Sequence, residues 1–196
     1  ISIEINPMFV LAWSNKGLAL DHMGRYEEAI ACYNKALKIN PVSELAWNNK
    51  GITLANLKKL NEAIACYEQA IKKNDTRAEI WYNKCLALLN LGRYRESIVC
   101  YDRAIKINPA YAIALNDKGV ALKNLNQHYE AIECYDKALE INSALKEAWY
   151  NKGNALYNLG RHNDSLDCYC KALELNSADA VIWYAKGLAE DELGLR

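Results

Sequence analysis

The chain lacks an excess of either charge. Its 196 residues include 24 Lys or Arg and 24 Asp or Glu, so the formal net charge is zero. Because the positive and negative charges balance, the sequence has no excess of positive charge that would attract nucleic acid or an anionic membrane surface. No apolar run approaches the roughly 20 residues that a helix needs to cross a bilayer. We therefore expect no nucleic-acid partner and no membrane association. No signal peptide is visible, and a chain that opens on Ile1 is typical of an excised fragment.

Motifs for chemistry are also missing. The sequence contains no pairing of nucleophile and base, no glycine-rich phosphate loop and no convergent pair of carboxylates. The short CxxC and HxxxH spacings that metal sites favour are absent as well. Seven cysteines, five of them at regular long spacing, favour free thiols in a reducing compartment over a disulfide framework. We predict no enzyme activity, no metal or cofactor, and a cytoplasmic location.

What the chain does contain is one unit repeated with a period of 34 residues. Shifting the sequence by that period superimposes its tryptophans, namely Trp13, Trp47, Trp81, Trp149 and Trp183, with Leu115 at the remaining position. The same shift superimposes the tyrosines Tyr33, Tyr67, Tyr101, Tyr135 and Tyr169. A period of this length with this pattern indicates a tandem array of helix–turn–helix repeats.

The first unit carries the landmarks Trp13, Gly17, Gly24, Tyr26, Ala29, Tyr33, Ala36 and Pro41. In this order they resemble the pattern of the tetratricopeptide repeat family, and the resemblance extends over essentially the whole chain. It implies an all-α fold, an α-solenoid of stacked antiparallel helix pairs that forms a right-handed superhelix. It also implies a scaffold that presents a peptide-binding groove, although it does not identify the partner.

Alignment of the units predicts a single array over residues 1–196. Residues 1–9 are expected to be the tail of a preceding repeat, and residues 180–196 the first helix of a truncated sixth repeat. The five full repeats between them are 10–43, 44–77, 78–111, 112–145 and 146–179. Each repeat should hold a first helix with the tryptophan position, here called helix A, and a second helix with the tyrosine position, called helix B.

The end of helix A carries residues suited to a left-handed backbone conformation. Glycine adopts that conformation without steric cost, and asparagine is the next best residue for it. The residues at this position are Gly24, Lys58, Gly92, Asn126, Gly160 and Gly194. Lys58 is the exception, and the sequence offers no reason for it.

The face of helix A that points away from the core is expected to determine function. At about 100° per residue, positions i, i+4, i+7 and i+11 share one face of a helix. In the family that the chain resembles, the A helices line the concave surface of the superhelix. The candidate peptide-binding residues on this face are Asn15, Leu18, Asn49, Ile52, Asn56, Asn83, Leu86, Asn90, Val120, Asn124, Asn151, Asn154 and Asn158.

A ladder of asparagines suits an extended peptide, because each amide offers an acceptor and two donors to a peptide unit. Each hydrogen bond contributes only about 0.5–1.5 kcal/mol, so several rungs must act together. Asn15, Asn49, Asn83 and Asn151 resemble the asparagine ladder of the O-linked N-acetylglucosamine transferases. In the alternative interpretation, the asparagines only link neighbouring helices, and the aliphatic residues are covered by the adjacent helix A.

The sequence also bears on two narrower binding modes. Co-chaperone repeats hold a C-terminal carboxylate with basic residues, and the matching positions here are Leu11, Ser14, Leu45, Asn48, Glu79 and Tyr82. Such a clamp is therefore not expected. A basic row that could bind anions is formed by Lys16, Lys50, Lys84, Lys118, Lys152 and Lys186. We expect instead that the lysine stems pack between repeats while the ammonium groups reach water or a neighbouring carboxylate.

Three functions remain open at this stage. The leading hypothesis is a protein–protein interaction scaffold whose groove binds an extended peptide or a partner helix. The second is a structural module that stacks head to tail through its uncapped ends, where Trp183, Tyr184 and Leu188 would lie exposed. The third is a regulatory array that forms part of a larger enzyme.

Overall fold

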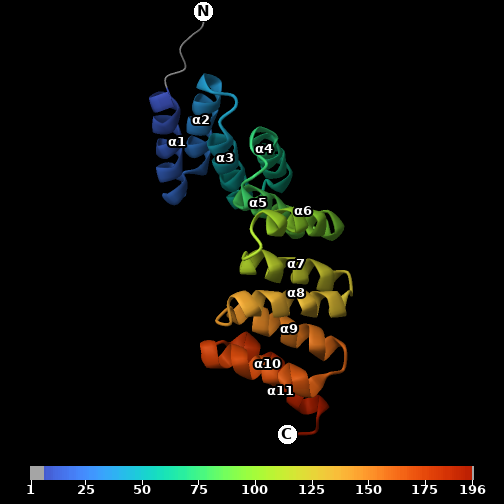
Figure 1. Ribbon diagram of the computed structural model, residues 1–196. Coiled ribbons are helices and arrows are strands. Elements are labelled where there is room, and N and C mark those ends of the chain that lie inside the picture. The colour runs from blue at the N-terminus through green and yellow to red at the C-terminus, as the bar shows by residue number, and fades with distance from the viewer. Residues whose placement is uncertain (1–6, 196) are drawn as a thin grey trace, which may run out of the picture. The chain divides into compact units, whose positions relative to one another are not determined.

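The computed structural model describes residues 7–195, which form eleven α-helices joined by short turns (Figure 1). Their bounds are α1 Pro7–His22, α2 Tyr26–Ile39, α3 Glu44–Asn56, α4 Leu60–Lys73, α5 Ala78–Asn90, α6 Tyr94–Ile107, α7 Ala112–Asn124, α8 His128–Ile141, α9 Lys146–Asn158, α10 His162–Leu175 and α11 Ala180–Glu192. The predicted all-α solenoid of helix pairs is confirmed. Residues 1–6 of the predicted preceding repeat lie outside the described residues, and residues 7–9 belong to α1.

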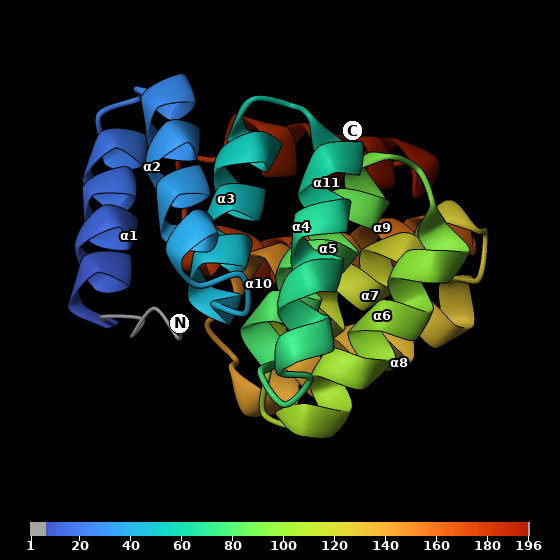
Figure 2. The ribbon, with the colours of Figure 1, turned by 90° about the horizontal axis from the view of Figure 1, so that it is seen from above.

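The chain divides into two compact units, residues 1–96 and 97–196. In the first unit, α1 packs against α2 and α3 packs against α4, as Figure 2 shows. There α2 also contacts α3, and α4 contacts α5. In the second unit, α7 pairs with α8 and α9 with α10, while α8 and α10 contact α9 and α11. Within a unit, each helix B therefore packs on helix A of its own repeat and of the next.

Each complete helix pair within a unit packs a tyrosine ring of helix B on a glycine of helix A. Tyr67 is only 2% exposed, and a Cβ atom built on Gly51 would lie 2.5 Å from its ring. The same construction on Gly119 meets Tyr135 at 2.5 Å. A carbon contact this short is not tolerated in a close-packed interior. The two helices therefore approach as closely as they do because this position of helix A has no side chain.

Two hydrogen bonds fix the turn from helix B to the following helix A wherever that helix A carries the tryptophan. The side chain of Asn74 accepts a hydrogen bond from the backbone N–H of Thr76 (3.0 Å). The indole Nε1–H of Trp81 donates to the carbonyl oxygen of Asp75 (2.9 Å). The equivalent indole bonds are made by Trp47, Trp149 and Trp183. The repeated tryptophan thus ties the first turn of helix A to the preceding loop.

The turn from helix A to helix B requires a positive φ angle. Gly92 has φ +73°, and the two residues without glycine's freedom, Lys58 and Asn126, have φ +62° and +60°. An L-residue in this left-handed region costs roughly 1–2 kcal/mol, and asparagine is the residue that offsets part of that cost with its short polar side chain. Lys58 therefore adopts the backbone conformation of the glycines at an energetic cost.

Candidate peptide-binding groove

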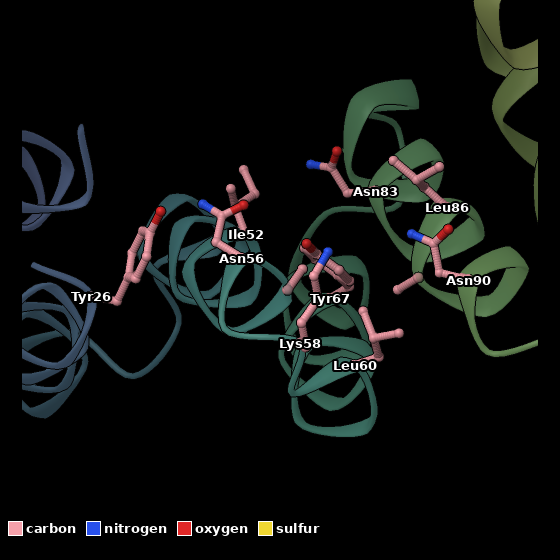
Figure 3. A pocket seen from close by; sticks show the side chains of 11 residues that line it. Tyr26, Ile52, Asn56, Lys58, Leu60, Tyr67, Asn83, Leu86 and Asn90 are labelled. Carbon is pink, nitrogen blue, oxygen red and sulfur yellow. The ribbon is translucent and has the colours of Figure 1, made fainter. Parts of the chain in front are cut away.

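A groove of about 570 Å³ lies between α3 and α5 in the first unit (Figure 3). Five of the predicted binding residues line it: Ile52 and Asn56 from α3, and Asn83, Leu86 and Asn90 from α5. Six further lining residues were not among the predicted site residues: Tyr26, Ala55, Lys58, Leu60, Tyr67 and Ala87. The lining contains no carboxylate.

Helix geometry explains how these side chains meet. Ile52 and Asn56 lie four residues apart and so share one face of α3, and Leu86 and Asn90 do the same on α5. Because α3 and α5 are in contact, the two faces form opposite walls. Ile52 and Leu86 are half-buried, which leaves part of each aliphatic side chain open to the groove. Tyr67, on the helix B between them, contributes its ring to the lining.

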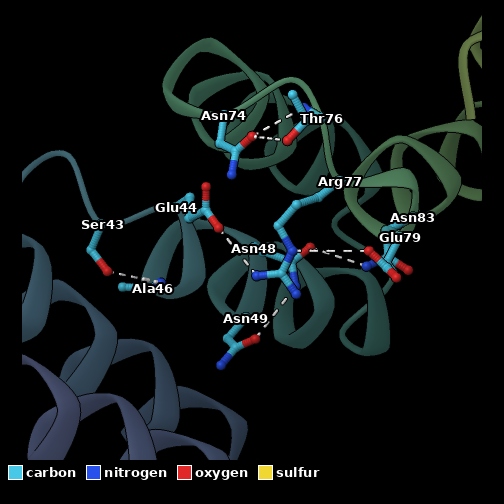
Figure 4. A network of polar contacts seen from close by, with 10 residues as sticks. All are labelled: Ser43, Glu44, Ala46, Asn48, Asn49, Asn74, Thr76, Arg77, Glu79 and Asn83. Atoms are coloured by element: carbon cyan, nitrogen blue, oxygen red, sulfur yellow. Dashed lines mark hydrogen bonds and ion pairs between the residues drawn. The ribbon is translucent and has the colours of Figure 1, made fainter. Parts of the chain in front are cut away.

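Two asparagines of the first row bond to a neighbouring helix A, and Figure 4 shows the bond made by Asn83. In the first unit, Nδ2 of Asn83 donates to Oδ1 of Asn48 at 3.0 Å. In the second unit, Nδ2 of Asn151 donates to Oδ1 of Asn116, also at 3.0 Å. Asn49 accepts a weaker hydrogen bond from Asn48 (3.4 Å). Asn83 and Asn151 therefore link neighbouring helices, as the alternative interpretation predicted, and only part of their hydrogen-bonding capacity is left for a ligand. The bond of Asn49 stays within α3.

A second row of asparagines, formed by the last residue of helix A in four repeats, is different. Asn56, Asn90 and Asn158 are exposed, and their side chains make no hydrogen bond with another described residue. Asn124 is also exposed but donates to the carbonyl oxygen of Val120 within its own helix (2.8 Å). In the groove, Asn56 and Asn90 therefore keep both donors and the acceptor of the amide available.

The remaining predicted residues lie outside the α3–α5 groove. Asn15 and Leu18 are exposed on α1, Leu18 with 41% of its surface accessible. Val120 is half-buried on α7. Asn154 accepts a hydrogen bond from the hydroxyl of Tyr169 at 2.9 Å, so its side chain serves the packing between α9 and α10. A binding role for these residues stays a prediction.

The groove supplies hydrogen-bond donors and one positive charge. Burial raises the pKa of the Tyr67 phenol above its ordinary range, so the group remains a neutral hydroxyl that can donate. That hydroxyl makes no hydrogen bond with another described residue. Lys58 is exposed, and its ammonium group forms no ion pair within the described part of the chain. The groove can therefore bind polar, acceptor-rich groups beside its aliphatic walls.

The repeated lysine row is largely neutralised. Three of its members pair with an acidic residue of the preceding helix B: Lys84 with Glu68 at 2.8 Å, Lys118 with Asp102 at 2.5 Å and Lys152 with Asp136 at 2.6 Å. Lys50 instead lies over the ring of Trp47, 5.4 Å from its centroid. The prediction that these ammonium groups reach a neighbouring carboxylate is confirmed at the three paired lysines.

The cysteines behave as small buried residues. All seven are free, and only Cys170 is exposed. Burial raises the pKa of Cys66 and Cys134, and that of Cys168 to about 11, so these thiols stay protonated at neutral pH. Within residues 7–195, no group of three or more His, Cys, Asp or Glu side chains is arranged to hold a metal ion. None of the described helices is both long and apolar enough to cross a membrane.

The predicted self-association residues lie on the outer side of α11. Trp183, Tyr184 and Leu188 are 50%, 69% and 38% exposed. The opposite side of the same helix is buried, because Ile182, Ala185 and Ala189 pack in a cluster with residues of α10. Three apolar side chains on one helix thus remain accessible.

Comparison with known proteins assigns the chain to a family. Five consecutive ranges match the model of the tetratricopeptide repeat: residues 10–41, 45–76, 78–111, 112–144 and 147–179. These ranges cover well over half of the 196 residues. The chain therefore belongs to the tetratricopeptide repeat family, and it is a repeat scaffold of the class that mediates protein–protein interactions.

Several solved structures share the fold. A crystal structure of MamA superimposes with a TM-score of 0.78 at 27% identity, over 82% of this chain and 94% of that one. YrrB, described as a TPR protein with an unusual peptide-binding site, gives a TM-score of 0.78 at 22% identity, over 95% and 96%. PilW, a type IV pilus biogenesis factor, gives 0.84 at 23% identity, over 94% and 86%. At these identities the last two similarities show the fold alone.

A short stretch also matches an uncharacterised protein of Methanocaldococcus jannaschii. The two sequences are 53% identical over 36 residues, about the length of one repeat. The match spans 18% of this chain and 42% of that relative, less than half its length.

Proposed function

We propose that the chain is a scaffold whose α3–α5 groove binds an extended peptide. The binding would use the backbone of the peptide rather than one particular sequence. Asn56 and Asn90 stand on opposite walls, and each amide can pair with a C=O and an N–H of a peptide unit. Ile52 and Leu86 supply apolar surface beside these amides. A peptide with alternating polar and aliphatic contacts would match this arrangement.

The unbonded asparagines of the groove are the main support for this proposal. Residues from three repeats converge on one groove of about 570 Å³, and its asparagines Asn56 and Asn90 make no side-chain hydrogen bond with another described residue. Amides that only served packing would be bonded within the fold, as Asn83 is to Asn48. The fold that this chain shares with YrrB, a protein described as having a peptide-binding site, supports the proposal at the level of architecture.

The test begins with a phage-displayed library of random dodecapeptides, selected on the 196-residue protein. The affinity of a selected peptide is then measured by fluorescence anisotropy for the wild type and for the double variant Asn56→Ala, Asn90→Ala. We expect the double variant to bind at least roughly fivefold more weakly, because each asparagine loses at least one hydrogen bond of about 0.5–1.5 kcal/mol.

A matched control is Asn34→Ala, which removes an exposed asparagine of α2 that does not line the groove. This variant should bind the peptide as the wild type does, and all three proteins should show the same helical circular dichroism. Equal affinity of the double variant and the wild type would refute the asparagine contacts.

A second candidate function is self-association through α11, favoured by the exposure of Trp183, Tyr184 and Leu188. Burial of such side chains in a contact between copies stabilises it, whereas a charge on the same surface opposes it. We expect sedimentation velocity to detect dimers or larger species whose population falls in Tyr184→Glu. A wild type that stays monomeric at millimolar concentration would exclude this function.

A further inference from the structure

Lys58 is the one residue of the groove that neither the repeat pattern nor the packing explains. The equivalent turns use Gly24, Gly92, Gly160 and Gly194, and one uses Asn126. The turn needs only a backbone with positive φ, which glycine supplies without strain. A long side chain at φ +62° is strained. Strained backbone conformations cluster at functional sites, where the role of the side chain explains why the strained residue is present.

The Lys58 side chain points into the groove. Figure 3 shows it rising beside Tyr67 toward the space between Asn56 of α3 and Asn90 of α5. Tyr67 is only 2% exposed. Its hydroxyl reaches the same space and makes no hydrogen bond with another described residue. An ammonium group and the unpaired hydroxyl of an otherwise buried tyrosine thus converge on one place.

The charge of Lys58 is not compensated within the fold. The lysines of the repeated row lie 2.5–2.8 Å from a carboxylate in three of the repeats. Lys58 has no such ion pair within residues 7–195, and no acidic residue lines the groove. The groove therefore carries a net positive charge, and all its uncommitted polar groups can donate hydrogen bonds to an anion.

We propose that this groove selects a peptide with an acidic side chain, Asp or Glu, next to an aliphatic residue. The carboxylate would lie between the Lys58 ammonium and the Tyr67 hydroxyl, with the aliphatic side chain against Ile52 and Leu86. A single positive charge matches the single negative charge of a carboxylate. Because Asn56 and Asn90 line opposite walls, the peptide backbone passes between them, so an internal side chain fits better than a chain terminus. This inference rests on the proposed function and adds its ligand class.

The test compares peptides selected by phage display on the wild type and on Lys58→Gly. Glycine is the residue found at this turn in four other repeats, so the variant keeps the fold. We expect Asp or Glu beside Leu, Ile or Val to be enriched on the wild type and not on the variant. A synthetic peptide from the wild-type selection and its Glu→Gln form should then differ in affinity on the order of fivefold, with no difference on Lys58→Gly.

Two controls separate the possible sources of the effect. Lys59→Gln removes the adjacent exposed lysine, which does not line the groove, and should preserve the preference for Glu. Amidation of the peptide's C-terminus should leave the affinity unchanged. An affinity that falls on amidation but not on Glu→Gln would overturn the acidic side chain as the ligand.

The outcomes also distinguish this inference from the function on which it rests. Selected peptides that lack acidic enrichment, but still lose affinity in Asn56→Ala, Asn90→Ala, would overturn the role of Lys58 and leave the peptide groove standing. Failure of the library to yield any peptide that binds the groove would overturn both.

Discussion

Lys58 belongs both to the turn that ends α3 and to the groove between α3 and α5. At the same position of the other turns, the chain uses glycine or asparagine. The backbone requirement is the same in every case, since φ lies between +60° and +73° at all six positions. The backbone of this turn favours glycine, whereas the proposed acidic ligand requires the ammonium group of a lysine.

We therefore expect that replacing Lys58 by glycine stabilises the fold and weakens binding of the proposed acidic peptide. We expect Lys58→Gly to increase the free energy of unfolding by about 0.5–1 kcal/mol, because the left-handed strain is removed while glycine's larger chain entropy offsets part of the gain. The reverse change, Gly92→Lys, should lower it by a similar amount. Urea unfolding followed by circular dichroism measures both, and a lower urea midpoint for Lys58→Gly would contradict the strain.

At the scale of the helices, the contact of helix A with helix B depends on a missing side chain. A Cβ atom on Gly51 would overlap the Tyr67 ring, which is enclosed by α3 and α4. Overpacking of this kind shifts the ring or the helices apart. Because Tyr67 also lines the groove, a side chain added at Gly51 would displace part of the groove lining.

We therefore expect Gly51→Ala to lower the free energy of unfolding by about 1–3 kcal/mol. The comparison variant Asn61→Ala, at an exposed position near the start of α4, should stay within about 0.5 kcal/mol of the wild type. Thermal melts of the three proteins provide the measurement. A Gly51→Ala variant as stable as the wild type would show that the ring moves freely and that the helix contact is not tight.

The sequence predicted the helix pairs correctly, because every unit repeats the same pattern of core residues. Peptide binding by the outer face of helix A stays a prediction. The period places Ile52 and Asn56 on one face of helix A, and both line the groove. It could not show that Asn83 donates to Asn48, since this bond depends on the rotation of one helix A against the next. Nor could it place the Lys58 side chain, whose direction follows from a φ angle that lysine rarely adopts.

At the scale of the whole molecule, buried tyrosines repeat through both units and couple stability to alkaline pH. Burial raises the pKa of Tyr33 to about 12, and the pKa values of Tyr67, Tyr135 and Tyr169 move in the same direction. An unfolded tyrosine loses its proton near pH 10. The folded state therefore holds protons that the unfolded state has released, and stability must fall as the pH rises through this range.

We expect the urea midpoint to be constant up to about pH 9 and to decrease progressively between about pH 10 and pH 12. Tyrosinate absorbance should show the exposed tyrosines, such as Tyr129, titrating before the buried ones, which ionise only as the protein unfolds. A midpoint that does not change between about pH 8 and pH 11 would contradict the burial of these phenols in a neutral form.

Binding of a peptide by the amides of Asn56 and Asn90 can be observed in the NMR signals of these two side chains. A peptide selected on the 196-residue protein is titrated into the ¹⁵N-labelled chain, and the side-chain NH₂ resonances are followed. We predict that the signals of Asn56 and Asn90 shift and show contacts to peptide backbone protons, while the exposed control Asn34 stays unchanged. Shifts confined to α11, with Asn56 and Asn90 unaffected, would contradict the groove as the binding site.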